Sequence, residues 1–146
     1  MSYPGRLQVQ LLDDRATAPA RSRDGDAAYD LTAVDATTIS AGDRALVGTG
    51  VAVAIDRNWC GLIVPRSGLA ARDGVVPVLG LIDPNYRGEL KVTLRNQGTD
   101  DYSVAPGDRI AQLLLVPFGG PEVGVVDRLP DEHGDRGSEG FGSSGR

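Results

Sequence analysis

Cysteine, lysine and histidine are nearly absent from this sequence of 146 residues, which has one cysteine, one histidine and, in Lys91, one lysine. Because Cys60 has no second cysteine to pair with, an internal disulfide framework and a cysteine-cluster metal site are both excluded. No apolar run approaches the roughly 20 residues of a membrane-spanning helix. The amino terminus also lacks the charged start and apolar stretch of a secretory signal. We therefore expect a cytoplasmic protein with no membrane partner.

Acidic residues outnumber basic ones, 20 to 15, which gives a formal net charge of -5. This balance opposes adhesion to nucleic acid, so no nucleic-acid partner is expected. Every basic residue except Lys91 is an arginine, whose planar guanidinium binds phosphate oxygens through two parallel hydrogen bonds. The composition therefore leaves room for a local cationic pocket only.

Glycine and proline are abundant, with 20 and 9 residues, so the chain turns often and has little room for long helices. Apolar residues alternate at Leu7, Val9 and Leu11, and further short β-rich runs follow. These runs occupy residues 45–49, 51–55, 61–64, 90–94 and 110–116. One short helix is expected over residues 67–72. The pattern predicts a single all-β domain, a sandwich or a barrel.

Two glycine-rich segments, residues 65–70 and 136–145, combine arginine, hydroxyl groups and bare backbone amides. Glycine lets the main chain approach an anion, and a helical turn that opens at Ser67 directs amides toward it. Both segments are candidates for phosphate binding. Composition alone favours the simpler interpretations, a surface turn capped by Ser67 and a flexible linker. Three other distinctive residues are assigned no role: His133, Trp59 and Cys60.

Residues 80–89 form a hairpin-like stretch in which Pro84 and Asn85 suit a turn. Asp83 ends its apolar run, and a partly desolvated carboxylate there can act as a general base toward water. The alternative is that Asp83 only starts the turn through its side chain.

Asp26 and Asp30 bracket the three residues Ala27, Ala28 and Tyr29 in the first third of the chain. Mg²⁺ takes few protein carboxylates and keeps several of its waters. The two carboxylates can therefore hold a hydrated Mg²⁺ together with a phosphate chain, although such spacing alone is weak evidence.

Five segments follow one another along the chain: DAAYDLTA (26–33), PRSGLA (65–70), GLIDPNYRGELKV (80–92), GDRIAQLLLVP (107–117) and RGSEGFGSSG (136–145). In this order they resemble the five motifs of the trimeric deoxyuridine triphosphate nucleotidohydrolases (dUTPases). One such segment would be weak evidence, but together they span nearly the whole chain. The resemblance therefore favours the phosphate-binding interpretation of both glycine-rich segments.

The resemblance implies a distorted jelly-roll (β-clip) barrel over residues 1–130, followed by a flexible carboxy-terminal arm at 131–146. Members of the family form homotrimers whose three active sites lie between subunits, each closed by a neighbour's arm. The implied reaction hydrolyses dUTP to dUMP and pyrophosphate with Mg²⁺ as cofactor. It supplies dUMP for thymidylate synthesis and keeps uracil out of DNA.

The resemblance also implies a role for individual residues. Asp83 would orient and deprotonate the water that attacks the α-phosphorus, and Asp30 would hold waters around the Mg²⁺. The residues implied to bind phosphates are Arg66, Ser67, Gly68, Gln112, Arg136, Gly142, Ser143 and Ser144. Those implied to hold the nucleoside are Gly80, Leu81 and Ile82 through their backbone, Lys91 nearby, Tyr86 beneath the deoxyribose and Phe141 over the uracil. A packed ring at Tyr86 leaves no room for a 2′-hydroxyl.

Two positions depart from the family pattern. Pro77 stands three residues before Gly80, where the family usually has Asn, and it offers uracil neither a side-chain amide nor a backbone N–H. Ala28 replaces a common Gly in the first motif and narrows the approach to Asp30.

Two other functions compete with dUTP hydrolysis. The related dCTP deaminases carry a Glu three residues before a strand-ending Asn, where this chain has Thr93 before Asn96. They also carry Arg-Ser-Ser where this chain has Arg-Ser-Gly. A regulator that binds nucleotide without turnover is the second alternative, and the intact candidate residues argue against it: Arg66, Asp83, Gln112 and Arg136.

Overall fold

The computed structural model describes residues 7–131 of the chain. Short strands dominate this range, together with one helix, so the expected all-β class is confirmed. The elements are β1 (Gln8–Leu11), β2 (Ala28–Thr32), β3 (Thr37–Ile39), β4 (Arg44–Gly48), β5 (Val51–Ala54), β6 (Trp59–Val64), α1 (Ser67–Asp73), β7 (Val75–Pro77), β8 (Gly80–Ile82), β9 (Lys91–Asn96), β10 (Tyr102–Val104) and β11 (Arg109–Pro117). No helix within these described residues is long and apolar enough to cross a membrane.

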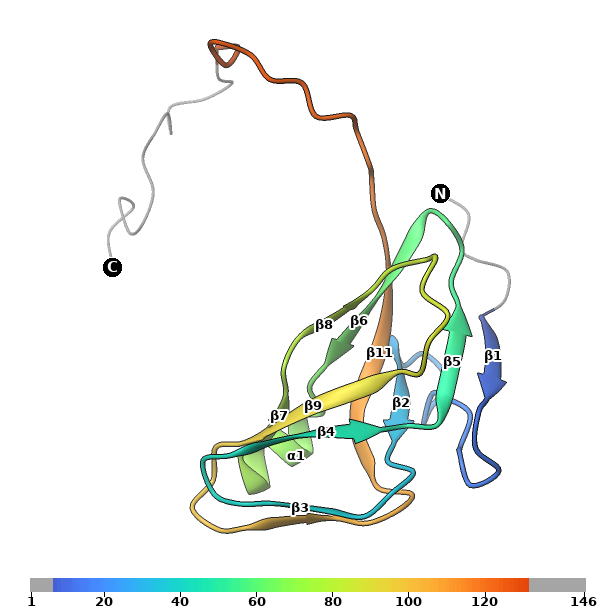
Figure 1. Ribbon diagram of the computed structural model, residues 1–146, viewed down its shortest axis with the longest axis vertical. Helices are drawn as coiled ribbons and strands as arrows, with labels where there is room; N and C mark the ends of the chain where they lie inside the picture. The colour runs from blue at the N-terminus through green and yellow to red at the C-terminus, as the bar shows by residue number, and fades with distance from the viewer. Residues whose placement is uncertain (1–6, 132–146) are drawn as a thin grey trace.

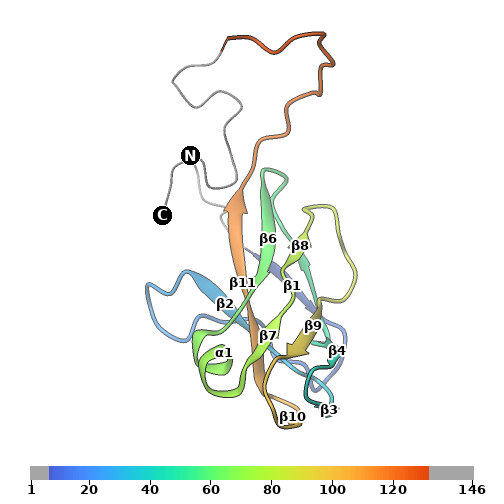
Figure 2. The same ribbon diagram turned by 90° about the vertical axis from the view of Figure 1, so that its left-hand side faces the viewer.

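The strands pair antiparallel in four small sheets around one core. The largest sheet has the order β2-β11-β6-β8, and a second has the order β4-β9-β7. Two-stranded pairs, β1-β5 and β10-β3, complete the barrel. Figure 1 shows β11 running along the molecule, with β3 across its lower end, and Figure 2 shows α1 packed beside β7. The strand β11 therefore joins the first motif, on β2, to the segment that leads into the second, on β6.

The core is built by residues that alternate along the strands. In β9, Val92 and Leu94 are buried while Lys91 and Arg95 are exposed, as expected for a strand with one face in water. Asn96 ends this strand and is fully buried. Its amide donates to the carbonyls of Ile39 and Asp100, and its Oδ1 accepts the N–H of Gly98. The Asn96 side chain is thus fully occupied in holding the turn that follows β9.

The helix α1 confirms the short helix expected over 67–72. Leu69 anchors it in the core, and it ends at Gly74, whose φ of 65° is the left-handed conformation that glycine adopts without strain. A Cβ at Gly74 would also lie 3.0 Å from the backbone nitrogen of Gly98. The turn from α1 into β7 therefore depends on glycine.

The stretch at residues 80–89 is not a paired hairpin, which corrects the expectation from sequence. It turns at Pro84 and Asn85, but β8 pairs with β6 while β9 pairs with β4 and β7. The turn therefore carries the chain from one sheet to another.

Beyond β11 the chain leaves the barrel, and residues 118–131 extend away without helix or strand (Figures 1 and 2). Three apolar side chains of this segment are strongly exposed: Val123, Val125 and Leu129. The expected division into a domain at 1–130 and an arm at 131–146 stays a prediction, because all of the arm except Asp131 lies outside the described residues.

Candidate functional site

Four of the residues that the sequence places in a phosphate site lie together in the fold. Asp30 is on β2 and Gln112 faces it from β11, in direct register. Arg66 and Ser67 follow β6 at the start of α1. These four residues line a depression of about 520 Å³.

Ser22 and Arg109, which were not predicted as site residues, complete this arrangement. We call Asp30 and the four side chains in contact with its carboxylate the Asp30 cluster; those four are Ser22, Arg66, Arg109 and Gln112. A signal for Arg109 was present, since it lies within the fourth motif. Ser22 lies in a turn before the first motif and gives no such signal.

Both carboxylate oxygens of Asp30 accept hydrogen bonds or face a cation. Oδ1 accepts Nε2 of Gln112 at 3.3 Å and lies 3.4 Å from Nε of Arg66. Oδ2 accepts the hydroxyl of Ser22 at 2.5 Å and Nη1 of Arg109 at 3.3 Å. Arg66 also donates from Nη1 to the backbone carbonyl of Arg109 at 3.0 Å. The cluster therefore ties together segments from four parts of the chain.

The electrostatics of the cluster keep Asp30 ionised. Its side chain is 10% exposed, and this burial opposes the charged form. The hydrogen bonds from Ser22, Gln112 and Arg109, with the charge of Arg66, outweigh burial and hold the pKa of Asp30 below its ordinary value. Two guanidinium groups against one carboxylate leave the cluster with a net positive charge, which suits an anionic ligand.

The Asp30 cluster can bind a metal ion only through intervening water molecules. Both Asp30 oxygens already have partners, and among residues 7–131 no group of three or more His, Cys, Asp or Glu side chains could hold a metal. Asp26 lines the same depression, but its carboxylate accepts the backbone N–H of Arg23. A Mg²⁺ ion at this place would therefore depend mainly on phosphate oxygens for its direct ligands.

A second, smaller pocket of about 180 Å³ lies at the turn after β8, and we call it the Asp83 pocket. It is lined by Leu81, Ile82, Asp83, Tyr86, Glu89 and Lys91. The ring of Tyr86 is fixed by a hydrogen bond from its hydroxyl to the carbonyl of Glu89 at 2.9 Å. Lys91 Nζ lies 3.7 Å from a carboxylate oxygen of Glu89. Gly80, on β8, packs against Ile63.

Asp83 itself is exposed, contrary to the expectation of a partly desolvated carboxylate. The turn is closed through the backbone, by the N–H of Tyr86 and the carbonyl of Asp83 at 3.1 Å. Within residues 7–131 no hydrogen bond or ion pair involves the Asp83 carboxylate. The alternative role, in which the side chain starts the turn, is therefore not what the structure shows.

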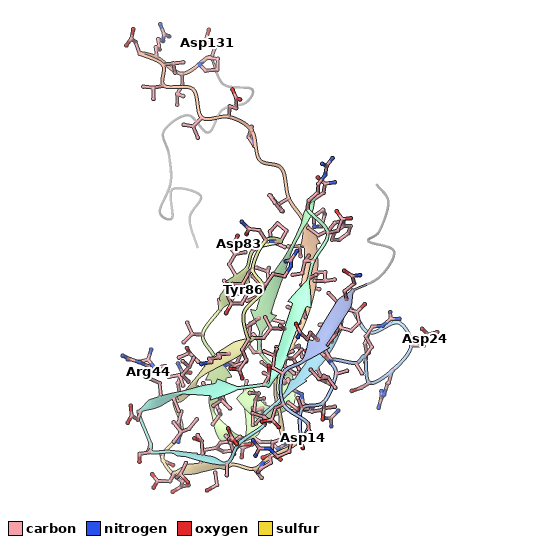
Figure 3. The ribbon with its side chains drawn as sticks, turned by 45° about the vertical axis from the view of Figure 1, so that its right-hand side comes forward. Asp14, Asp24, Arg44, Asp83, Tyr86 and Asp131 are labelled. Carbon is pink, nitrogen blue, oxygen red and sulfur yellow. The ribbon has the colours of Figure 1, made fainter. Side chains whose placement is uncertain are left out.

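The structure does not bring the Asp83 pocket and the Asp30 cluster together in one chain. Ile82 lies opposite Gly61 on β6, so Asp83 is level with Cys60, six residues before Arg66. Six residues of strand at about 3.3 Å each span roughly 20 Å. Figure 3 shows Asp83 and Tyr86 on one side of the barrel and Asp24, in the loop that carries Ser22, on the other.

The two departures from the family pattern lie in different places. Pro77 is buried at the end of β7, opposite Leu94, so its ring belongs to the barrel wall. Ala28 lines the depression near Asp30. The remaining candidates lie outside the described residues: Arg136, Phe141, Gly142, Ser143 and Ser144.

Comparisons with known proteins agree on one family. A family model described as dUTPase matches residues 14–145. A deoxyuridine 5'-triphosphate nucleotidohydrolase from Mycolicibacterium gilvum is 47% identical over 146 residues, covering 95% of this chain and 94% of that protein. One from Yarrowia lipolytica is 43% identical over 139 residues, covering 95% of this chain and 88% of that protein.

Solved structures give the same result. The dUTPase of Staphylococcus bacteriophage 80alpha, solved with dUPNHPP, superposes with a TM-score of 0.91 at 30% identity, over 98% of this chain and 100% of that chain. A mutant dUTPase from phage phi11 of S. aureus, solved to describe a structural Mg(II) ion, superposes with a TM-score of 0.82 at 27% identity, over 87% of this chain and 100% of that chain. The expected jelly-roll fold is thereby confirmed.

Proposed function

This chain belongs to the dUTPase family, and from that premise we propose that it hydrolyses dUTP to dUMP and pyrophosphate, with Asp83 assisting the attack of water on the α-phosphorus. The observation that carries the proposal is that phosphate-binding groups and a candidate general base lie at two separate places in the fold. A net cationic cluster suited to phosphates surrounds Asp30, and a carboxylate without a partner stands beside the exposed ring of Tyr86. The cytoplasmic location expected from the sequence is part of this proposal.

The active site is assembled between copies of the chain. About 20 Å of strand separates the backbone of Asp83 from that of Arg66, so the Asp83 pocket and the Asp30 cluster are two distinct surfaces of one chain. A second copy that places its Asp83 pocket against the Asp30 cluster would complete the site. We propose the homotrimer of the family as that assembly.

Each half then has its own task. Arg66, Ser67, Gly68 and Gln112 bind the phosphates, and the guanidinium of Arg66 offsets charge that grows as pyrophosphate leaves. In the other half, Asp83 accepts a proton from the attacking water, whose oxygen forms the new bond to the α-phosphorus.

The nucleoside is held by the Asp83 pocket. The backbone at Gly80, Leu81 and Ile82 recognises uracil, with Lys91 nearby. The ring of Tyr86 lies beneath the deoxyribose. The hydrogen bond from Tyr86 to Glu89 supports this role, because it fixes the ring in one place. A fixed ring leaves a ribose hydroxyl no room.

Mg²⁺ is the cofactor of this proposal and would neutralise charge on the triphosphate when bound. Asp30 would accept hydrogen bonds from waters around the metal at the exposed edge of its carboxylate. The arm at 131–146 would close the site of a neighbouring subunit, with Arg136 on the γ-phosphate, Phe141 over the uracil and three further residues around the phosphates: Gly142, Ser143 and Ser144.

Release of pyrophosphate from dUTP, measured beside dCTP, dTTP and UTP, tests the proposal. Asp83→Asn keeps the size of the side chain but removes the base, which typically costs ~10² to 10⁴ in rate. Binding of a non-hydrolysable dUTP analogue should persist in this variant. Asp14→Asn is the matched control, because Asp14 is exposed and lines neither the Asp83 pocket nor the depression around Asp30.

Three outcomes would contradict the proposal. Wild-type turnover retained by Asp83→Asn would remove the proposed base. Ammonia released from dCTP would favour a deaminase instead. Tight binding of dUTP with no pyrophosphate from the wild-type protein would favour the regulator.

A further inference from the structure

Arg109 occupies a central position in the Asp30 cluster. Its Nη1 donates to Asp30 Oδ2 at 3.3 Å and to the hydroxyl of Ser22 at 3.0 Å. Its backbone carbonyl accepts Nη1 of Arg66. A single residue thus contacts the carboxylate, the loop in front of it and the arginine beside it.

A β-bulge places Arg109 there. In a regular strand, residues three apart such as Arg109 and Gln112 point to opposite faces. Here Arg109 pairs with Thr32 while Ala111 already pairs with Leu31, so Ile110 is an extra residue in β11. Bulges re-aim side chains and increase local twist. As a result Arg109 and Gln112 both reach the carboxylate of Asp30, one at each oxygen.

The position of Arg109 determines the net charge of the Asp30 cluster. With Arg109 present, two guanidinium groups face one nearly buried carboxylate, and the cluster is net positive. Without it, Asp30 would have only Arg66 to neutralise it. The cluster would then be neutral, and Arg66 would be held by the carboxylate rather than left to bind an anion.

We propose that Arg109 is a positioning residue: it shares the Asp30 carboxylate with Arg66 and so leaves Arg66 available to the phosphates. It acts through Asp30 and makes no contact with the nucleotide. Ser22, hydrogen-bonded to both Asp30 and Arg109, fixes the geometry of the pair. This inference rests on the proposed function, since it concerns the site that binds the triphosphate.

A double-mutant cycle on the full chain tests the role. The variants are Arg109→Met, Asp30→Asn and the two together, with the dissociation constant of a non-hydrolysable dUTP analogue measured by calorimetry. Arg109→Met should weaken binding tenfold or more in the wild-type background. A tenfold loss corresponds to about 1.4 kcal/mol and is expected if Arg66 no longer contacts a phosphate. In the Asp30→Asn background it should change binding by less than about twofold, because no carboxylate remains to capture Arg66.

Conservative and control variants sharpen the result. Arg109→Lys keeps the charge near Asp30 and should recover most of the affinity. Arg44→Met removes an exposed arginine of β4 that has no ion-pair partner among the described residues, and should leave binding unchanged. If Arg109→Met fails to fold, Ser22→Ala replaces it, and a severalfold loss of affinity that disappears in the Asp30→Asn background is expected.

Equal weakening by Arg109→Met in both backgrounds would show direct contact with phosphate and overturn the positioning role. A loss no larger than that of Arg44→Met would overturn any role in binding. Hydrolysis of dUTP by the wild-type protein is measured separately, so a failure of the proposed function is distinguished from a failure of this inference.

Discussion

Gly88→Ala tests the role of the Tyr86 ring without altering the tyrosine. A Cβ at residue 88 would lie 2.5 Å from Oη of Tyr86 and 2.7 Å from Cζ. Real side chains do not approach this closely, so either the backbone or the ring must move. The Tyr86 residue is 43% exposed, and solvent gives its ring room to leave.

The energetic costs of keeping and of moving the Tyr86 ring indicate which of the two occurs. Keeping the ring in place against the new methyl group costs about 1–3 kcal/mol, as overpacking usually does. Moving the ring breaks its hydrogen bond to Glu89, a net cost of about 0.5–1.5 kcal/mol. We therefore expect the ring to move and the fold to remain, with a melting temperature lower by only ~1–6 °C. Loss of a contact of this size changes discrimination about 10- to 200-fold, so selectivity for dUTP over UTP should fall at least tenfold.

The assay compares kcat/KM for dUTP and UTP. Gly119→Ala is the matched control, because a Cβ there meets nothing within 4 Å. Tyr86→Phe keeps the ring but removes the hydrogen bond that fixes it, so it should lose less discrimination than Gly88→Ala does. If Gly88→Ala discriminates as well as Gly119→Ala does, the ring of Tyr86 does not exclude the ribose hydroxyl.

Two further predictions concern Pro77 and Asp30. Pro77→Asn should lower KM for dUTP, because it supplies an amide that can hydrogen-bond to uracil. It should also lower the melting temperature, because residue 77 is buried. An unchanged or higher KM would show that the backbone alone recognises uracil. The lowered pKa of Asp30 means that its contribution to stability is complete above the ordinary value of 3.8 and is lost as the pH falls through the lower folded pKa. Chemical denaturation of Asp30→Asn should therefore show a shallower loss of stability in acid than the wild type, and equal slopes would contradict the assignment.

Much of the fold was predictable because most of its longer strands are runs of apolar and β-branched residues bounded by turn residues. The runs that became β4, β5, β6, β9 and β11 were all identified, as was the helix α1. The strands β3, β7, β8 and β10 have three residues each, too few for any period to show. Their pairing depends on neighbours far away in the sequence.

The phosphate half of the site could be predicted by residue, but its geometry could not. Asp30, Arg66 and Gln112 came from motifs, and the structure brings all three together. Arg109 could not be placed with Gln112 from sequence, because regular alternation puts them on opposite faces and only the bulge at Ile110 reverses this. Nor does a linear sequence reveal that Asp83 is about 20 Å away from Arg66.

The central claim, that one site uses Asp83 from one chain and Arg66 from another, is tested most directly by mixing two inactive variants. Arg66→Ala and Asp83→Asn chains, each with its own tag, are co-expressed, purified as mixed assemblies through both tags and assayed for pyrophosphate release from dUTP. In a trimer that contains both kinds of chain, one of the three sites receives both intact residues, so activity should return to roughly one third of the wild-type value. Verified mixed assemblies that stay as inactive as either variant alone would contradict the claim.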